Sequence, residues 1–273
     1  MKAIKEGLKV LSRGTCGTAF CSLLNSEYGV PNEIAEIAAS PFAGGLLNRG
    51  YQCGMIGGAV LAAGAESYRR NEDTGEAIAM AITATQHLME SFKKRTNTIS
   101  CRDITDMDLT GKLAPLKVLF TGKAFGCMKL AGRWAPEAIK SADEGLSDES
   151  VSFCPGSVSC ASEVVRKMGA TEEEMLMVAG YAGGLGLSGK ECGALSAAIW
   201  YKMVDWIKKN PGKSPSSFDS LETKKMLRAF YVQTDSEVLC SKITNKEFKD
   251  IDDHSEYIKN GGCKKIIDAL AAL

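Results

Sequence analysis

The segment FAGGL at 42–46, followed by Gly50 and Cys53-Gly54, has a second copy in the chain: YAGGL at 181–185, followed by Gly189 and Cys192-Gly193. The two copies lie 139 residues apart. The same spacing relates three pairs of cysteines, which are Cys21 and Cys160, Cys53 and Cys192, and Cys101 and Cys240. Two more pairs keep it within three residues, namely Cys16 with Cys154 and Cys127 with Cys263. So many matches at one spacing indicate an internal duplication with five cysteines in each copy.

The join between the copies falls in the polar stretch 140–150, which predicts a first module at 1–142 and a second at 148–273. Helical signals dominate both. In the first module they predict helices over 18–28, 31–39, 54–70 and 74–95, with Cys101 in a loop and Cys127 opening a short final helix. In the second they predict helices over 159–168, 171–182 and 192–209, and Thr171 with Glu174 fits a capping box. The predicted fold is mainly α, with two repeated helical modules in a pseudo-two-fold arrangement that pack as a pseudo-dimer.

Composition narrows the classes of function. The chain has 273 residues, 45% of them hydrophobic, and a formal net charge of zero. This balance argues against a nucleic-acid partner, and no apolar run is long enough to span a membrane. We therefore expect a soluble, cytoplasmic protein. Because a reducing cytoplasm disfavours structural disulfides, its ten cysteines favour metal binding or redox work.

Histidine is scarce, which excludes several kinds of site. His87 and His254 are the only two, they occupy non-equivalent positions in the copies, and we expect both at the surface. No C-x-x-C-H motif is present, so c-type haem is not expected. Since no catalytic acid–base constellation is visible, the sequence favours an electron carrier or redox-active protein and does not establish an enzyme.

Glycines lead into one cysteine of each copy. Cys53 and Cys192 each follow a glycine-rich loop and precede a helix, where unpaired backbone N–H groups and the helix dipole stabilise a thiolate. N–H groups directed at cluster sulfurs also tune a reduction potential. The glycines proposed to support a cofactor in this way are Gly44, Gly45, Gly50, Gly54, Gly183, Gly184, Gly189 and Gly193. An alternative is that Gly44, Gly45, Gly183 and Gly184 only cap the preceding helix.

Each half resembles the redox-active protein family named for its cysteine pattern, in which C is followed by GCAxxG or CGAxxG, then C, then C. The motif matches CGMIGG at 53–58 and CGALSA at 192–197. Met55 departs from the motif alanine in the first copy, and Ala197 departs from the last glycine in the second. The resemblance covers nearly all of each half, so the chain looks like a tandem fusion. It extends distantly to the split-Soret cytochromes, although their haem motif is missing here.

The resemblance implies a ligand set and a cofactor. The family's four cysteines match Cys21, Cys53, Cys101 and Cys127 in the first half, and Cys160, Cys192, Cys240 and Cys263 in the second. It favours one iron–sulfur cluster per half, of a type that the sequence does not fix, for electron transfer with an unidentified redox partner protein or for redox sensing. Cys16 and Cys154 are additional to the pattern, and their turn-forming surroundings predict auxiliary thiols.

Two other functions stay open. In a thiol–disulfide redox protein without metal, Cys53 or Cys192 would attack and Cys16 or Cys154 would resolve. The third possibility is zinc or another non-catalytic metal–thiolate site, although zinc sites usually show closely paired cysteine knuckles.

Overall fold

The computed structural model describes residues 2–108, 110, 122–153, 155–213 and 221–273. In these residues the regular secondary structure is helical, with no strand and only two isolated antiparallel bridges, Gln52 to Ser100 and Glu191 to Leu239. The mainly α fold predicted from the sequence is confirmed. None of the described helices is both long and apolar enough to cross a membrane.

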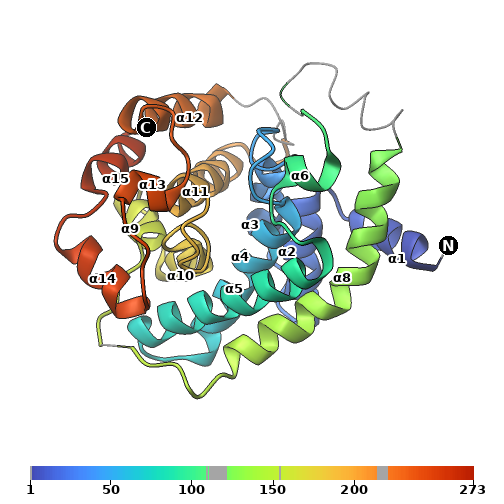
Figure 1. Ribbon diagram of the computed structural model, residues 1–273, viewed down its shortest axis with the longest axis horizontal. Helices are drawn as coiled ribbons and strands as arrows, with labels where there is room; N and C mark the ends of the chain where they lie inside the picture. The colour runs from blue at the N-terminus through green and yellow to red at the C-terminus, as the bar shows by residue number, and fades with distance from the viewer. Residues whose placement is uncertain (1, 109, 111–121, 154, 214–220) are drawn as a thin grey trace.

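The first module contains α1 (Lys2–Leu11), α2 (Cys16–Glu27), α3 (Glu33–Ala38), the 3₁₀ turn η1 (Ser40–Phe42), α4 (Gly54–Arg70), α5 (Thr74–Thr96), α6 (Cys101–Thr105) and α8 (Lys123–Leu146). The second contains α9 (Cys160–Lys167), α10 (Glu172–Met177), η2 (Ala179–Tyr181), α11 (Gly193–Lys209), α12 (Leu221–Thr234), α13 (Cys240–Thr244), α14 (Ile251–Lys259) and α15 (Lys264–Ala271). Figure 1 shows the first module in blue to green and the second in yellow to red.

The two modules share one order of elements. α2, α3, η1, α4 and α6 are repeated as α9, α10, η2, α11 and α13, with a cysteine at the start of α2, α6, α9 and α13. The outer elements differ, because α1 precedes only α2 and the long α8 stands where the second module has the short α15. The helices next to the cysteines are therefore the same in both modules, whereas the outer helices differ.

Local signals explain where several helices begin. Asp73 caps α5 by accepting a hydrogen bond from Glu76 N at 2.9 Å. Thr171 and Glu174 form the predicted capping box at the start of α10. Glycine lets α2 and α4 touch through their backbones, since a Cβ on Gly58 would lie 2.0 Å from Gly17 O. Caps therefore set where α5 and α10 begin, and glycine sets how closely α2 and α4 pack.

Three predicted boundaries were wrong. The helix expected over 171–182 ends at Met177 and is followed by the turn η2. Cys101 was expected in a loop, but Ser100 caps a short helix that begins at Cys101. Cys127 was expected to open a short helix, but it lies in the first turns of α8, which continues for 24 residues and tolerates Pro136. The run of alanines and the buried Trp134 hold this helix against the core, and it extends past the predicted module end at 142.

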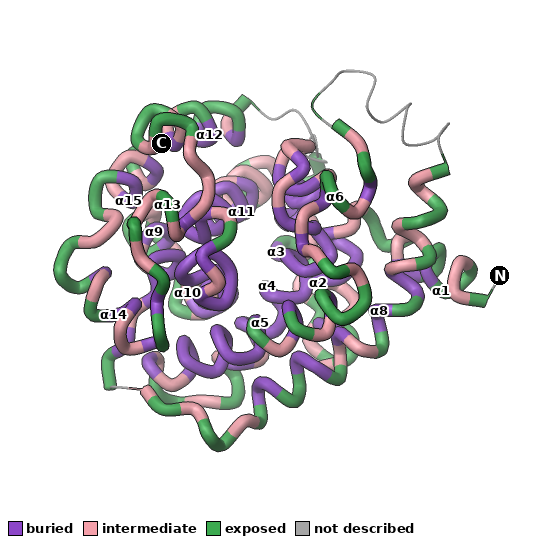
Figure 2. The backbone as a smooth tube through the Cα atoms, in the orientation of Figure 1, coloured by how far each residue is buried: buried purple, intermediate pink, exposed green. Residues whose placement is uncertain are grey.

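The modules bury their inner helices against each other. α4 packs on α10, and its equivalent α11 packs on α3. Tyr181 Oη donates to Gly57 O at 2.7 Å, and Trp200 Nε1 donates to Ala35 O at 3.1 Å, both in fully buried surroundings. The burial map places these central helices inside a shell of exposed outer ones (Figure 2). The two contacts are reciprocal, since α11 is the equivalent of α4 and α3 is the equivalent of α10, as a pseudo-two-fold pairing of modules requires.

Candidate functional site

A left-handed loop precedes the motif cysteine in each module. Residues 44–48 and 183–187 all have positive φ, between 53° and 78°, so five successive residues of each loop lie in the left-handed range of φ. This conformation costs roughly 1–2 kcal/mol for each residue other than glycine, and Leu46 and Leu185 adopt it nevertheless. Both leucines are buried, so their packing offsets part of that cost. Such concentrated strain in both copies points to a site where the backbone must follow one particular path.

Backbone hydrogen bonds place two cysteines of each module side by side. Cys53 N donates to Ile99 O at 2.7 Å, and Cys101 N donates to Tyr51 O at 2.7 Å. The same pattern recurs in the second module, where Cys192 N donates to Val238 O and Cys240 N donates to Lys190 O. These bonds flank the isolated bridges and bring the motif cysteine next to the third cysteine of the pattern.

In the first module, Cys16 joins Cys53, Cys101 and Cys127. A negative charge on Cys101, Cys16 or Cys127 would raise the pKa of the Cys53 thiol. A negative charge on Cys16 or Cys127 would likewise raise the pKa of the Cys101 thiol. The four sulfurs therefore lie within electrostatic reach of one another. A Cβ on Gly54, the residue after Cys53, would lie 2.7 Å from Cys16 Sγ. Cys16 is therefore part of this thiol group.

Cys21 lies apart from that group, contrary to the convergence expected for it. Its side chain is fully buried, Asn25 Nδ2 donates to its sulfur at 3.8 Å, and its charged neighbour is Glu36. Residues five apart on a helix point in different directions, so α2 cannot turn Cys16 and Cys21 toward one site. The constant 139-residue spacing pairs Cys21 with Cys160 in sequence, but α2 starts one turn earlier than α9.

In the second module the expected four cysteines gather. The pKa of the Cys160 thiol is raised well above its ordinary value, first by burial and then by Cys240, Cys263 and Cys192. Cys160 is the first residue of α9, as Cys16 is the first residue of α2. The backbone N–H of Gly183 hydrogen bonds to Cys160, and that of Gly44 hydrogen bonds to Cys16. Cys16 and Cys160 thus have matching positions in the two sites.

All the gathered thiols are held in the protonated form. Burial raises the pKa of Cys16 to about 11 and that of Cys263 to about 12, and it raises the pKa of Cys127 and Cys192 as well. Hydrogen bonds oppose this rise, from the backbone of Met55 to Cys53 and from Ala194 and Leu195 to Cys192. Removing a proton from these buried groups requires a compensating positive charge.

The predicted glycines are confined by close neighbours. A Cβ on Gly45 would lie 2.5 Å from Tyr51 N, and one on Gly184 would lie 2.7 Å from Cys240 Cβ. Gly50 and Gly189 pack against Arg102 and Ser241, and Gly54 and Gly193 pack against the backbone of Phe42 and Tyr181. Their positions beside the thiol groups are set by this packing. Their contact with a cofactor stays a prediction.

The geometry is looser than a single-ion site. Among the described residues, no three His, Cys, Asp or Glu side chains lie close enough together to hold one metal ion. Zn–S bonds of about 2.3 Å need sulfurs that nearly touch, whereas an iron–sulfur cluster separates its ligands by its own width. The two thiol groups together offer eight cysteines to such clusters, four in each module. Cys154 lies outside the described residues.

Sequence reasoning missed two groups near the second site. Burial raises the pKa of Cys263 and Cys240, and hydrogen bonds from the Tyr257 and Thr244 side chains offset part of that rise. Thr244 Oγ1 also donates to Cys240 O at 2.8 Å. Thr244 follows Cys240 by four residues, one helical turn, which is a signal the sequence does carry. The surface position expected for His254 was wrong: it is 1% exposed, packs against Phe248, and burial lowers its pKa to about 4.

The fold and its paired thiol groups define a helical, cysteine-based protein with two copies of one site. A family model described as "Putative redox-active protein (C_GCAxxG_C_C)" matches residues 15–165 and again residues 152–273. The chain therefore belongs to this redox-active protein family and carries its module twice. No curated protein and no solved structure matches the chain.

Proposed function

We propose that each module binds one iron–sulfur cluster through four thiolates and that the protein transfers or senses electrons. The ligands would be Cys53, Cys101 and Cys127 with Cys16 in the first module, and Cys160, Cys192, Cys240 and Cys263 in the second. Cys21, which the family pattern offered as the fourth ligand of the first module, is replaced by Cys16 in this proposal because it lies apart from the other three thiols.

The observation that carries the proposal is the gathering in each module of four thiols that are buried or half-buried and have a raised pKa. Four thiols in a desolvated space repel one another once they ionise, and only a cationic centre removes that penalty. Cluster iron supplies such charge, and four cysteine thiolates are the common ligand set of both [2Fe–2S] and [4Fe–4S] clusters. The donor set therefore fits the cofactor.

Backbone donors add a second line of support. Gly44 and Gly183 direct N–H groups at the equivalent sulfurs of Cys16 and Cys160. Hydrogen bonds to ligating sulfur stabilise the reduced, more negative state and raise the reduction potential. The left-handed loops would hold these donors in place in both modules.

The alternatives receive less support. A thiol–disulfide mechanism needs a thiolate at neutral pH, yet burial raises the pKa of Cys53 and Cys192. A zinc site needs ligands close together, and the described residues contain no such group for a single ion.

The test is anaerobic purification or reconstitution, with iron and acid-labile sulfide measured per chain. We expect about four iron atoms for two [2Fe–2S] clusters, or about eight for two [4Fe–4S] clusters, with a visible charge-transfer spectrum. Cys53→Ser should lose about half of the iron and Cys192→Ser the other half.

Two matched variants test the ligand assignment in the first module. Cys16→Ser should lower the iron content as Cys53→Ser does, whereas Cys21→Ser on the same helix should leave it near the wild-type value. Iron that is lost in Cys21→Ser and kept in Cys16→Ser would restore the family assignment. Protein that binds no iron or sulfide under any anaerobic condition would refute the cluster proposal as a whole.

A further inference from the structure

Helices α1 and α8 touch through their backbones. A Cβ on Gly7 would lie 1.7 Å from Met128 O, and a Cβ on Gly132 would lie 2.1 Å from Ala3 O. The reciprocal contacts make the helices antiparallel neighbours, so the first turns of α8 lie beside the end of α1. Glycine at both positions therefore fixes how the exposed residues of the two helices are arranged.

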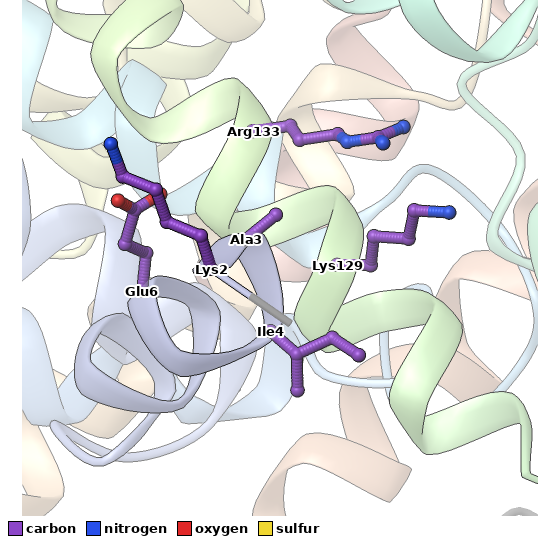
Figure 3. Close-up of a pocket in the computed structure, with 6 residues that line it drawn as sticks. All are labelled: Lys2, Ala3, Ile4, Glu6, Lys129 and Arg133. Carbon is purple, nitrogen blue, oxygen red and sulfur yellow. The ribbon is translucent and has the colours of Figure 1, made fainter.

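The outer side of this helix pair is basic. We call Lys2, Lys5 and Lys9 of α1 with Lys129 and Arg133 of α8 the basic face, and all five are exposed. A hollow of about 580 Å³ between the helices is lined by Lys2, Lys129 and Arg133 together with Glu6, Ala3 and Ile4. Figure 3 shows Lys129 and Arg133 projecting in the same direction from α8, opposite Lys2 and Glu6.

These cations have not been neutralised by neighbouring groups. None of the five forms an ion pair with a residue that the structure describes, and Glu6 is the one acid in the lining of the hollow. The second site offers a comparison within the same chain. There Lys167 and Lys264 pair with Asp268, and Lys246 pairs with Asp253 at 2.5 Å. The five cations of the basic face differ from these three lysines in having no such acidic partner among the described residues.

Apolar surface accompanies the charge. Phe125 is 57% exposed on α8, and Leu8 is 48% exposed on α1. Phe125, Lys129 and Arg133 follow at intervals of four residues, so they form one stripe along the helix. An aromatic ring and an arginine are residue types enriched at the centres of protein–protein contacts, and lysine suits their polar rim.

We propose that the basic face is the docking site for an acidic redox-partner protein, which exchanges electrons with the first module; this rests on the proposed function. Cys127 lies in the first turns of the same helix and is half-buried, so a partner on the outer side of α8 would be about one helix diameter, roughly 10 Å, from the thiol group. A protein fits better than a membrane, because the apolar side of α1, with Gly7 and Val10, is already buried. A chain whose 33 Lys and Arg are balanced by 33 Asp and Glu also lacks the net positive charge of a nucleic-acid binder.

The kinetic test uses small oxidants of opposite charge on reduced, reconstituted protein. One electron passes from a reduced cluster to ferricyanide, giving ferrocyanide, or to hexaammineruthenium(III), giving the ruthenium(II) complex. The substitutions are made in the Cys192→Ser variant, so that only the cluster of the first module is oxidised. Where that variant is poorly folded, they are made in the wild-type protein and the rate of the fast phase of oxidation is measured. Lys129→Glu with Arg133→Glu should slow oxidation by anionic ferricyanide about tenfold at low ionic strength and speed oxidation by the cationic complex.

The control is Lys265→Glu, an exposed lysine two residues after Cys263 as Lys129 is two residues after Cys127. It should leave the rates at the first site within about twofold of the background, and roughly 0.5 M salt should remove the effect of the double variant. Equal rates in the double variant and the control, in protein with normal iron content, would overturn the docking proposal.

A binding test separates this inference from the cluster proposal. An acidic plant-type ferredoxin serves as the probe in titration calorimetry, which needs no cluster in the first module. We expect salt-sensitive binding that Lys129→Glu with Arg133→Glu weakens at least about fivefold and that Lys265→Glu leaves unchanged. Tighter binding to a 20-base-pair DNA duplex or to phosphatidylserine vesicles, or salt-dependent self-association in place of ferredoxin binding, would refute it. Absence of iron with intact ferredoxin binding would refute only the cluster.

Discussion

The rings of Phe42 and Tyr181 lie 5.6 Å apart between centroids, although 139 residues separate them in the chain. They occupy equivalent positions in the two modules, at the ends of η1 and η2. A contact between equivalent residues lies on the axis that relates two copies. Each residue also packs against the glycine that follows the motif cysteine of its own module, Gly54 or Gly193. The interface between modules is thereby continuous with both thiol groups.

Tyr181 should stabilise this interface through its hydroxyl. Tyr181→Phe keeps the ring contact and removes the donor to the buried Gly57 O. We expect the free energy of unfolding to fall by about 1–2 kcal/mol, measured by urea unfolding. Tyr201→Phe removes a hydroxyl that makes no hydrogen bond to a described residue, and it should change that free energy by less than about 0.5 kcal/mol. Equal losses in both variants would show that the buried hydrogen bond contributes nothing.

Gly64 should resist even the smallest side chain. A Cβ at this position would lie 2.3 Å from Leu176 O and 2.6 Å from Met177 O, so Gly64→Ala must push α4 away from α10. We expect a loss of about 2 kcal/mol or more in thermal or urea unfolding. Gly126→Ala is the control, since no atom lies within 4 Å of its Cβ in α8, and it should stabilise the protein by roughly 0.5–1 kcal/mol. A stable Gly64→Ala variant would contradict the described packing of the two modules.

The nine thiols that the structure describes should be unreactive in the native protein without cofactor. With the pKa of Cys16 raised to about 11, about one molecule in a thousand carries that thiolate at pH 8. Reaction with an aromatic disulfide reagent should be about 100-fold slower than in the denatured chain and should accelerate as the pH rises toward 11. A described thiol that reacts at the denatured rate at pH 7, identified by measuring the Cys154→Ser variant, would instead favour the thiol–disulfide function.

His254 should make stability depend on pH. Burial lowers its pKa to about 4 from an ordinary value of about 6.5, so the unfolded chain binds a proton more readily than the folded one. The contribution of neutral His254 to the free energy of unfolding is fully present above about pH 6.5. It is lost as the pH falls to about 4, which lowers that free energy by about 3 kcal/mol. His254→Leu should flatten this part of the wild-type profile in urea unfolding at pH 4.5 and 7, whereas His87→Gln should retain it. A parallel decline in His254→Leu and the wild type would assign the pH dependence to carboxylates.

Much of this protein could be predicted from local sequence. The duplication follows from matched spacings, and the helices follow from caps at Asp73 and Thr171 and from uncharged runs such as 54–65. Cys53 and Cys192 were placed correctly at helix starts, because a glycine-rich segment before a helix is a local signal. Each of these features depends on hydrogen bonds and side chains within a few residues.

Only the tertiary structure decided which thiols meet. The regular spacing favoured Cys21, yet the extra turn at the start of α2 turns Cys16 toward Cys53 and leaves Cys21 beside Asn25. The burial of His254 and the contact between Phe42 and Tyr181 likewise depend on segments far apart in sequence. The sequence by itself determined the repeat, the helices and the number of cysteines, because those are local or periodic properties. Tertiary packing selected the four thiols of each group, because the direction of a side chain depends on where its helix begins and on what the helix packs against.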